Sequence, residues 1–367
     1  MVPVRASNEW DPIEEVIVGT VFDHWMPGLD VSFKLFFHDN MFGQDLMGTR
    51  YEGDVPIKAE YVEHMAEDLE CFVSILEEYG ATVRRPMTPK KVKQVKTPYW
   101  NSTNHCALNV RDQAMVLGDC IVETPPAVRY RYFENDLMKH LFLEYFKEGA
   151  RWVCAPRPMI LDTSFDFSYV LEHNDDPVTV AWYEKLAAND HEMDCGIEMI
   201  FDAANCMRFD EDVVMNVATE NQRLGFRWLQ QTFPELRFHE VNMVDSHIDS
   251  TFVPLCEGLL LVDWNHFKGK DALPEFLQSW EVVSAPEGDY RPYEYDDSDA
   301  MLASRSIDIN VFSLDPNTIV CHDAYRPQLQ PLLKPYSIEC VPCRMRHSRI
   351  FSGAFHCVTL DIRRRQR

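Results

Sequence analysis

A cysteine near the C-terminal end of the sequence raises the first question of chemistry. Cys357 directly follows a histidine in FSGAFHCVTLDIRRR (351–365), in a segment that we predict to be a short strand. A cysteine nucleophile reacts as a thiolate, so it needs a base such as imidazole, and a carboxylate can orient that imidazole. The alternative interpretation, a small buried packing residue, is the more common role of a lone cysteine.

Two other segments contain residues that could complete such a site. MIFDAANCMRF (199–209) places Asp202 before two alanines, and DSHIDSTFVPL (245–255) places His247 two residues before Asp249. Each pattern alone has an ordinary explanation, because an aspartate before alanines is often a helix cap and a His-x-Asp sequence is common in loops. The partners of a nucleophile need not be neighbours in sequence, so the three segments are compatible with one catalytic site.

The elements that must position these residues form a repeated pattern. An apolar strand, an amphipathic helix and a second strand recur five times, in the ranges 14–86, 113–156, 212–241, 258–286 and 317–342. Apolar residues at helical spacing and short β-branched runs predict these elements, with helices over 57–80, 133–149, 219–233, 271–280 and 325–336. Five units without sequence identity indicate an α/β fold of quasi-repeated units about a central axis.

A doubly wound parallel sheet is the alternative architecture. Such a sheet normally uses one strand for each helix and carries a glycine-rich turn for phosphate. The sequence contains neither GxGxxG nor GxxxxGK. We therefore expect the quasi-repeated fold, in a single domain that spans residues 1–367.

The composition limits the class of partner. The chain has 367 residues, of which 46% are hydrophobic, and this is enough for a sizeable core. Its 35 basic and 59 acidic residues give a net charge of −24, which argues against nucleic acid or an anionic membrane and is compatible with a small cationic substrate. No apolar stretch approaches the ~18–20 residues of a membrane span, and the first residues, MVPVRASNEW, have no apolar signal core. We therefore expect the protein to be located in the cytoplasm.

The eleven cysteines are scattered rather than framed in pairs. With no secretory signal before them, we expect reduced thiols and no disulfide framework. Cys340 and Cys343 form CVPC, which looks like half of a zinc knuckle, but no second CxxC or spaced HxxxH accompanies it. The motif also lies in a predicted strand that ends at Pro342, so we expect no metal site and no cofactor.

Two long polar segments, 173–196 and 286–300, are predicted to be linking loops. Loops of this length are uncommon unless they cover a site or are disordered. The second is rich in acidic residues and tyrosine, and it is equally consistent with a solvated surface loop and with a lid.

The chain resembles the arginine amidinotransferases, the family that includes glycine amidinotransferase and inosamine-phosphate, toxin-pathway and antibiotic-pathway enzymes. The resemblance covers nearly the whole chain, and FDAAN, HIDST and FHC with a following RRR carry it, in this order and at this spacing, together with NEWDPIEEVIVGT (8–20). It implies a five-bladed, pseudo-symmetric α/β propeller, the pentein fold, which agrees with the five units counted above. It also implies an arginine donor and an amine acceptor, both small molecules, without a cofactor.

The resemblance assigns a role to each candidate residue. Cys357 matches the nucleophile, His247 the general acid and base, and Asp202 its carboxylate partner, while Asp112 and Asp249 match carboxylates that hold the guanidinium of the donor. A guanidinium is a planar cation with several N–H donors, so paired carboxylates suit it. Thiolate attack would give an amidino-cysteine, from which an incoming amine takes the amidino group, with ping-pong kinetics.

The sequence departs from the glycine-type enzymes around the expected substrates. His266 stands where they hold the donor carboxylate with an arginine, and Ser304 is what remains of a serine pair, with Arg305 as a compensating cation. Ser246 replaces a bulky residue before the catalytic histidine, which indicates an acceptor larger than glycine, as in toxin or antibiotic biosynthesis. Lysine, an aminocyclitol and an amine on a toxin or antibiotic scaffold stay open as acceptors, and so does oligomeric state, with a homodimer as one option.

Three other functions remain open on the same residues. Glycine amidinotransferase proper would use the smallest acceptor, and an arginine-deiminase-like hydrolase would use water and form citrulline and ammonia without an amine. A non-catalytic guanidine-binding protein would keep the fold and lose the chemistry. Reaction of Cys357 with a chloroacetamidine-type probe would separate this last case from the others.

Overall fold

The structure is a computed structural model that describes residues 3–37, 53–89, 94–103, 105–173, 176–189, 191–243, 247–265, 269–288, 293, 295–296, 299–304 and 306–365. Within these residues, five three-stranded sheets share one connectivity. The central strand of each sheet pairs antiparallel with one neighbour and parallel with the other. The chain between the two parallel strands contains helical turns, because parallel neighbours need a long crossover connection.

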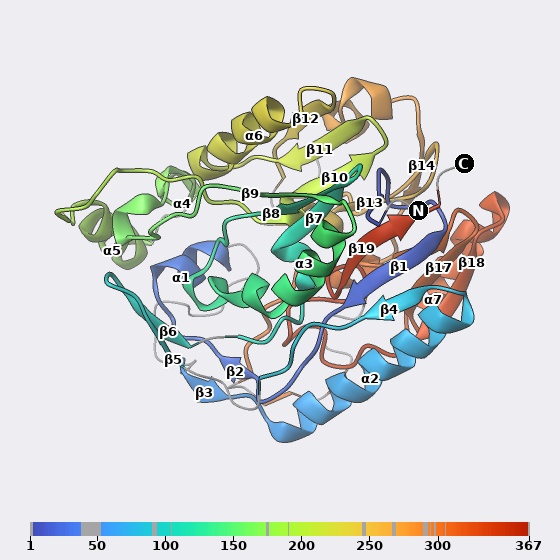
Figure 1. Cartoon of the computed structure of the whole chain (residues 1–367), viewed down its shortest axis with the longest axis horizontal. Helices are drawn as coiled ribbons and strands as arrows, with labels where there is room; N and C mark the ends of the chain where they lie inside the picture. Colours follow the sequence, from blue (N-terminus) through green and yellow to red (C-terminus); the bar gives the residue numbers. More distant parts are fainter. Residues whose placement is uncertain are drawn as a thin grey trace.

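The five sheets follow one another along the chain, and the last strand, β19, belongs to the first sheet (Figure 1). The sheets are β19 (Thr359–Arg364), β1 (Ile13–Val18) and β4 (Thr82–Arg84); β7 (Ala114–Leu117), β8 (Cys120–Glu123) and β9 (Arg151–Cys154); β10 (Cys206–Phe209), β11 (Asp212–Asn216) and β12 (Arg237–Val241); β13 (Phe252–Cys256), β14 (Leu259–Val262) and β15 (Glu281–Ser284); and β16 (Phe312–Asp315), β17 (Thr318–His322) and β18 (Glu339–Cys343). Two hairpins lie apart from them, β2 (Trp25–Met26) with β3 (Val55–Pro56) and β5 (Gln94–Lys96) with β6 (Asn101–Thr103).

Four of the five crossovers contain an α-helix, namely α2 (Ala59–Glu78), α3 (Lys139–Lys147), α6 (Glu220–Thr232) and α7 (Arg326–Leu333). The longest of them, α2, buries an apolar stripe at helical spacing against the sheet of β1; its members are Tyr61, Met65, Leu69, Phe72 and Leu76. Helix α6 begins at a capping box, in which the Thr219 hydroxyl accepts the backbone N–H of Gln222 over 3.3 Å. The α/β class and the repeated strand–helix–strand units are therefore as the sequence predicts.

The structure corrects the prediction in four places. Each sheet has an additional antiparallel strand, and 113–125 is a hairpin that turns at Gly118, whose φ of 59° suits glycine. Residues 271–280 form two short 3₁₀ turns rather than an α-helix, since Pro274 separates them. The predicted loop 173–196 contains α5 (Pro177–Ala187), and the N-cap Asp176 starts this helix. Cys357 lies in a turn that ends just before β19, not within a strand.

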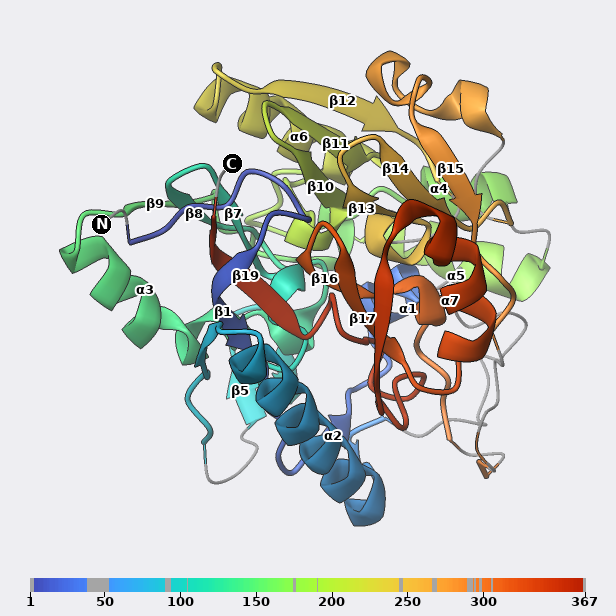
Figure 2. The same ribbon diagram turned by 90° about the vertical axis from the view of Figure 1, so that its right-hand side faces the viewer.

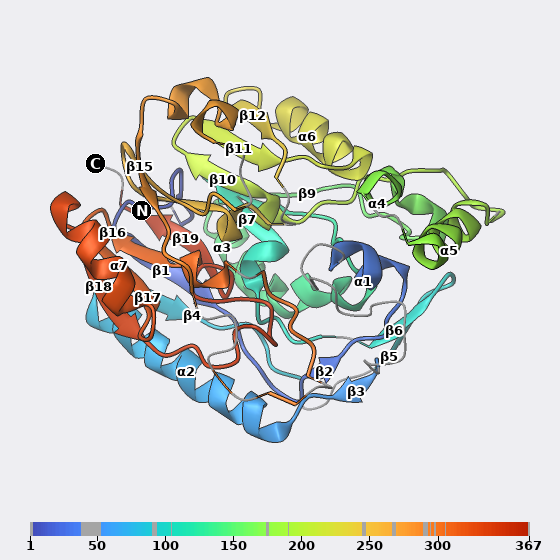
Figure 3. The ribbon, with the colours of Figure 1, turned by 180° about the vertical axis from the view of Figure 1, so that it is seen from behind.

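The first and last strands of the chain lie side by side, as Figure 2 shows for β1 and β19. The pairing places the turn that carries Cys357 against the N-terminal segment. Helix α1 (Val31–Phe36) follows β1 in the chain. It packs with α4 (Ser168–His173) and α5 through a shared hydrophobic cluster (Figure 3). The site described below lies among these segments.

A buried network of charges fastens the segments that carry the site. Arg208 on β10 pairs with Glu9 over 2.5 Å and with Asp361 on β19 over 2.6 Å. Arg111 pairs with Asp361 over 2.8 Å and with Glu9 over 3.2 Å, and its backbone N–H bonds to the carbonyl of Cys357. Because removal of one partner would leave an uncompensated buried charge, this network holds the N-terminal segment, β10 and β19 in one arrangement.

Among the described residues, no helix is both long enough and apolar enough to cross a membrane. The CVPC motif forms part of β18, where Cys340 and Cys343 contribute to different hydrophobic clusters. Residues three apart on a strand face opposite sides of the sheet, so these two thiols cannot hold one ion.

Candidate active site

The thiol of Cys357 is buried, with 3% of the residue exposed. The side chain of Asn310 contacts both the sulfur and the backbone of the turn that carries it. The side-chain amide of Asn310 donates to Sγ over 3.2 Å, and its carbonyl oxygen accepts the backbone N–H groups of His356 and Cys357, each over 3.0 Å. Asn310 follows the 3₁₀ turn Ile307–Ile309, which leads into β16. The sulfur is therefore fixed in position, with one hydrogen-bond donor directed at it.

His247 lies against two carboxylates. Its Nε2 atom is 3.0 Å from Oδ2 of Asp202, and its Nδ1 atom is 3.7 Å from Oδ1 of Asp112. Asp202 precedes a 3₁₀ turn, and its other oxygen accepts from the Gln113 side chain and from the backbone N–H of Ala127. The aspartate of FDAAN is thus both the cap position of a turn and the partner of the histidine, and the two interpretations of that motif are compatible.

Asp112 ends a 3₁₀ turn and has one engaged oxygen and one open oxygen. Arg131 pairs with Oδ2 over 2.5 Å and is held in turn by Glu134, at 2.6 Å. Oδ1 is buried and has no hydrogen-bond partner among the described residues. A buried carboxylate oxygen without a hydrogen-bond donor is costly. Nδ1 of His247 lies 3.7 Å away, beyond hydrogen-bond distance, so this oxygen is able to accept hydrogen bonds from a ligand.

Asp249 has the same character on the other side of the thiol. Its Oδ2 atom is 2.7 Å from Nδ1 of His356 and 3.5 Å from Sγ of Cys357. Nε2 of His356 reaches Glu9 of the charge network over 3.3 Å. Oδ1 of Asp249 is buried and has no partner in the described part of the chain. Two carboxylates from distant segments therefore each keep one oxygen open near the cysteine.

These negative charges determine the protonation of the site. Burial opposes a proton on His247, but the carboxylates of Asp112, Asp202 and Asp249 outweigh burial and raise its pKa to about 9. Burial, followed by the charges of Asp249 and Asp112, raises the pKa of the Cys357 thiol well above its ordinary value. Without a ligand, the site at neutral pH therefore holds a neutral thiol and a protonated imidazole.

The two open carboxylates differ in their own pKa shifts. Burial raises the pKa of Asp112, although Arg131 opposes this effect. Burial also acts to raise the pKa of Asp249, but the hydrogen bond and charge of His356 outweigh it and leave the pKa below its ordinary value. Asp249 is thus held as an anion beside the sulfur, and a bound cation would have a fixed negative partner there.

Of the four peripheral residues predicted from the sequence, Ser304 alone is described. It is buried, and its hydroxyl accepts the backbone N–H of Ser306 over 3.3 Å. No contact of the described residues joins it to the catalytic group. Ser246, His266 and Arg305 lie outside the described residues.

Three residues of this site were not predicted from the sequence. Asn310 has no local pattern that distinguishes it, because its contacts with the Cys357 segment cross 47 residues of chain. Arg131 stands in VRYRYFE (128–134), and His356 stands in FHC, a motif that carries the resemblance and was the available signal for this histidine. Both act on a carboxylate rather than on the sulfur.

An aromatic ring separates His247 from two pockets. Phe36, the last residue of α1, presents its ring edge-on to the imidazole, with 5.2 Å between ring centroids. One pocket lies between α1 and α4 and is mainly apolar, with Leu35, Phe36, Phe165, Tyr169, Val170, Ile200 and Met243 in its wall. The other is smaller, lies on the side of Arg131 and is bordered by Phe36 as well.

Comparison with known proteins gives a consistent set of relatives, although no protein-family model matches the chain. The inosamine-phosphate amidinotransferase 1 of Streptomyces glaucescens is 32% identical over 98% of this chain and 97% of its own length. The L-arginine:L-lysine amidinotransferase of Pseudomonas savastanoi pv. phaseolicola is 31% identical, over 99% and 95%. The solved structure of SxtG, an amidinotransferase of the saxitoxin biosynthetic pathway of Microseira wollei, superimposes with a TM-score of 0.81 at 31% identity, over 100% and 98%.

Hydrolases are more distant from this chain. The solved DDAH of Pseudomonas aeruginosa matches with a TM-score of 0.54 at 11% identity, over 95% of this chain and 99% of its own. Likeness at that level shows the α/β fold alone. The comparison of function therefore rests on the amidinotransferases.

Proposed function

Because the chain belongs to the amidinotransferase family, we propose that it transfers the amidino group of L-arginine to a primary amine larger than glycine, through a covalent intermediate on Cys357. The observation that carries the proposal is a pair of buried oxygens, Oδ1 of Asp112 and Oδ1 of Asp249, that accept no hydrogen bond from the described residues. A guanidinium placed between them would supply N–H donors to both and would lie next to the sulfur.

Binding of the donor also explains how a thiol with a high pKa becomes a nucleophile. The charges of Asp249 and Asp112 help to hold the Cys357 proton in place, and a bound cation would offset both charges. The thiol then releases its proton to solvent, because His247 is already protonated, and the Asn310 amide stabilises the thiolate through the existing hydrogen bond. The thiol takes a proton back from solvent when the products leave. The sulfur is thus activated mainly when a guanidinium is present, which limits side reactions of the free enzyme.

His247 has the protonation state that the first half-reaction needs. The thiolate attacks the guanidinium carbon and forms a C–S bond, and the bond to the leaving amine breaks as His247 gives that nitrogen its proton. In the free site the pKa of about 9 places this proton on His247 at neutral pH before the donor binds, and the hydrogen bond to Asp202 remains when the charges of Asp112 and Asp249 are offset. With arginine as donor the leaving product is ornithine, and the enzyme carries an amidino group on Cys357.

The second half-reaction reverses these roles. An incoming amine gives a proton to the now neutral His247 and attacks the amidino carbon, and the C–S bond breaks to restore the thiolate. Asp202 keeps the imidazole oriented through both steps, because its carboxylate holds Nε2 over 3.0 Å. We propose that Ser246 borders the acceptor, and that Ser304, His266 and Arg305 take part in holding the donor's carboxylate.

We further propose that the five sheets are the blades of a five-bladed pseudo-symmetric propeller in one domain, residues 1–367. The common connectivity of the five sheets and the pairing of β19 with β1 support this arrangement. A cytoplasmic location is part of the proposal, and the eleven free cysteines suit a reducing compartment. SxtG, a relative from the saxitoxin biosynthetic pathway, supports a role in natural-product biosynthesis, of a toxin or an antibiotic.

The test is to follow a labelled amidino group. The enzyme is mixed with arginine labelled at the guanidino carbon, and the protein mass and the modified peptide are measured before and after amines are added. We expect one amidino group on Cys357 that moves to an added amine, and none in Cys357→Ala. Cys343→Ser, at a buried thiol outside the site, is the matched control and should keep the label. Label on another cysteine would refute the mechanism, and citrulline formation without an amine would indicate a hydrolase.

A further inference from the structure

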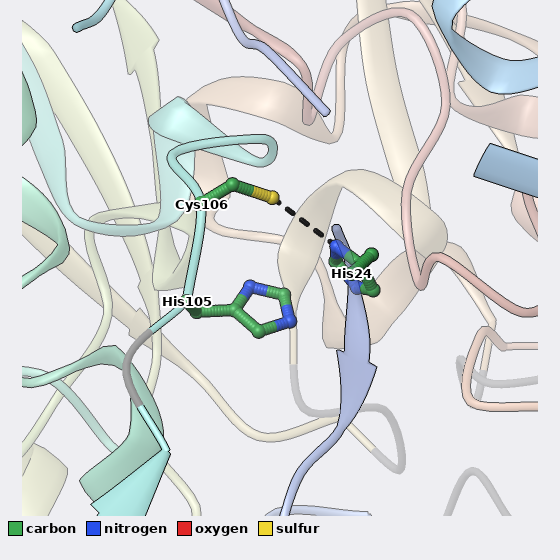
Figure 4. Close-up of side chains that lie close together, drawn as sticks. All are labelled: His24, His105 and Cys106. Carbon is green, nitrogen blue, oxygen red and sulfur yellow. Dashed lines mark hydrogen bonds between the residues drawn. The ribbon is translucent and has the colours of Figure 1, made fainter. Parts of the chain in front are cut away.

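Two histidines and a cysteine gather outside the catalytic group, in a place that the amidino transfer does not use. His24 precedes β2, and His105 and Cys106 follow β6 (Figure 4). Nδ1 of His24 is 3.1 Å from Sγ of Cys106, and the ligand atoms of all three residues lie within 4.8 Å of one another. This is the one group of three or more such side chains close enough to hold a metal ion in the described part of the chain.

The side chains are held in place by their surroundings. The rings of His24 and His105 meet edge to face, with centroids 3.9 Å apart. Phe351 packs against the first ring at 4.9 Å and Tyr130 against the second at 4.9 Å. The backbone of the first segment is fixed as well, because the N–H of Ile57 donates to the carbonyl of His24 over 2.8 Å. A site with restrained ligands loses little conformational entropy when an ion binds.

One side of the cluster faces a small pocket. His24 and His105 border this pocket, together with Asn109, Arg131 and Phe36. Cys106 is buried behind them, with 1% of the residue exposed. An ion held by the three side chains would therefore keep a fourth coordination position directed into the pocket, where water or a ligand could occupy it.

We propose that His24, His105 and Cys106 form a zinc site with one coordination position open to this pocket. Two imidazoles and one thiolate are the ligand types that zinc prefers in tetrahedral sites, and three protein ligands with an open fourth position are typical of non-structural zinc. Magnesium and calcium prefer oxygen ligands, which this cluster does not offer. The proposal is independent of the proposed transferase function.

The charges around the cluster are compatible with a dication. Arg131 lies on the same pocket, but Asp112 and Glu134 already pair with it and offset its charge. Burial raises the pKa of the Cys106 thiol to about 12, so the ion must displace a proton from sulfur to solvent, as zinc does in other thiolate sites. A bound ion with a thiolate ligand would then add a single net positive charge to the pocket.

The alternative explanation is a hydrogen bond between a buried thiol and an imidazole, with no ion. Metal binding separates the two explanations, and it should be measured on the Cys357→Ala protein, so that a zinc–sulfur signal cannot come from the thiol of Cys357. We expect about one Zn²⁺ per chain after removal of metal and titration with zinc alone. Replacement by Co²⁺ should produce a thiolate-to-cobalt charge-transfer band.

Ligand variants in that background complete the test. His24→Asn and His105→Asn should each weaken zinc binding by at least about 10-fold, the scale seen when even a supporting residue of a metal site is removed. Cys106→Ser should abolish the cobalt–thiolate band, and Cys120→Ser, at another buried thiol, should leave it unchanged. Binding that survives Cys106→Ser, or the absence of stoichiometric binding, would overturn the proposal.

A measurement that needs no change in the cluster covers the case in which these variants do not fold. Zinc X-ray absorption of the Cys357→Ala protein reports the atoms bound to the ion. One sulfur and two imidazole nitrogens are expected, with a further light atom in the open position. A shell of oxygen and nitrogen without sulfur would refute the site as assigned.

Discussion

The side-chain amide of Asn310 makes two hydrogen bonds with Cys357, one with the thiol and one with the backbone. The amide N–H donates to Sγ over 3.2 Å, and the amide oxygen accepts the backbone N–H of the same cysteine over 3.0 Å. One residue therefore fixes the turn that carries the sulfur and also provides the hydrogen-bond donor nearest to it. A donor to sulfur stabilises the thiolate more than the thiol, because a hydrogen bond to an ionised group is the stronger one.

The first prediction separates these two functions of Asn310. Asn310→Asp keeps an acceptor for the backbone and replaces the donor by a negative charge, so the thiol should become harder to ionise. We expect the formation of amidino-Cys357 to slow by about 10²-fold, the scale for loss of one preorganised donor at a reacting centre. The pH dependence of Cys357 alkylation should move to higher pH. Asn317→Asp, the same change in an exposed turn, should do neither.

The second prediction concerns proton transfer. His247→Asn should lower turnover by about 10²- to 10⁴-fold, the usual contribution of a positioned acid or base. Asp202→Asn should be nearly as damaging, because the imidazole would lose the carboxylate that orients Nε2. His239→Asn is a matched control, since it breaks a similar contact of 2.7 Å with Asp212 away from the site. Activity near that of the wild type in His247→Asn would exclude this histidine from the mechanism.

The third prediction is a pH dependence of stability. The pKa of His247 is raised from 6.5 to about 9 on folding, so its proton stabilises the fold fully below pH 6.5, and the contribution disappears as the pH rises through 9. A shift of this size corresponds to about 3 kcal/mol at 1.36 kcal/mol per pH unit.

Denaturant unfolding of the wild type and of His247→Asn at each pH tests this. The difference in the free energy of unfolding should be largest below pH 6.5 and should decrease towards pH 9. Cys357 is present in both proteins, so its own ionisation cancels in the comparison. A difference that stays constant over this range would show that the raised pKa does not contribute to stability.

The fourth prediction assigns His356 to positioning of the donor. Its ring joins Asp249, at 2.7 Å, to Glu9, at 3.3 Å, so it sets the direction of the open oxygen of Asp249. His356→Gln should raise the KM for arginine more than it lowers kcat, because it alters the grip on the guanidinium and leaves the proton-transfer group in place. Loss of a hydrogen bond to a charged group costs about 1.5–3 kcal/mol.

A separate readout distinguishes positioning by His356 from general damage to the fold. Arginine should protect Cys357 of the wild type from alkylation at lower concentrations than it does in His356→Gln. If KM and protection are unchanged while thermal stability falls, His356 serves only the buried charge network.

Local patterns predicted most of the helices and the central strands, because each apolar stripe and β-branched run reports its own burial. The stripe of α2 from Tyr61 to Leu76 is an example. The 3₁₀ turns that carry Asp112, Asp202 and Asp249 have no such periodicity, and neither does the pairing of β19 with β1. Those features depend on contacts between distant segments, which spacing within one segment cannot reveal.

The candidate site illustrates the same difference. Cys357, His247 and Asp202 were found through their motifs, and the resemblance supplied their common role. Neither the Asn310 contact nor the link from His356 through Asp249 could be read from a motif, since each requires the folded arrangement. The cluster of His24, His105 and Cys106 was missed for a similar reason, because 80 or more residues of chain separate its first member from the others.

The last prediction concerns the size of the acceptor. Ser246 precedes His247 in the sequence, and the Phe36 ring, which contacts the imidazole, also borders the pocket between α1 and α4. If this side admits the acceptor, long or ring-borne amines should be better substrates than glycine. Ser246→Met should then penalise large acceptors by roughly 1–3 kcal/mol, which is about a 10- to 200-fold loss in kcat/KM, the range for one or two methylenes in a shaped pocket.

The measurement pairs acceptor kinetics with the rate of amidino-Cys357 formation from arginine. Ser246→Met should slow the transfer to large amines and leave the first half-reaction close to the wild type, because the donor and the acceptor occupy the thiol in turn. Phe36→Leu, which removes ring atoms beside the same imidazole, should act in the opposite direction on large amines. Glycine as the best acceptor of the wild type, or an equal loss for every acceptor in Ser246→Met, would place acceptor selection elsewhere, with the acidic segment 286–300 as the next candidate.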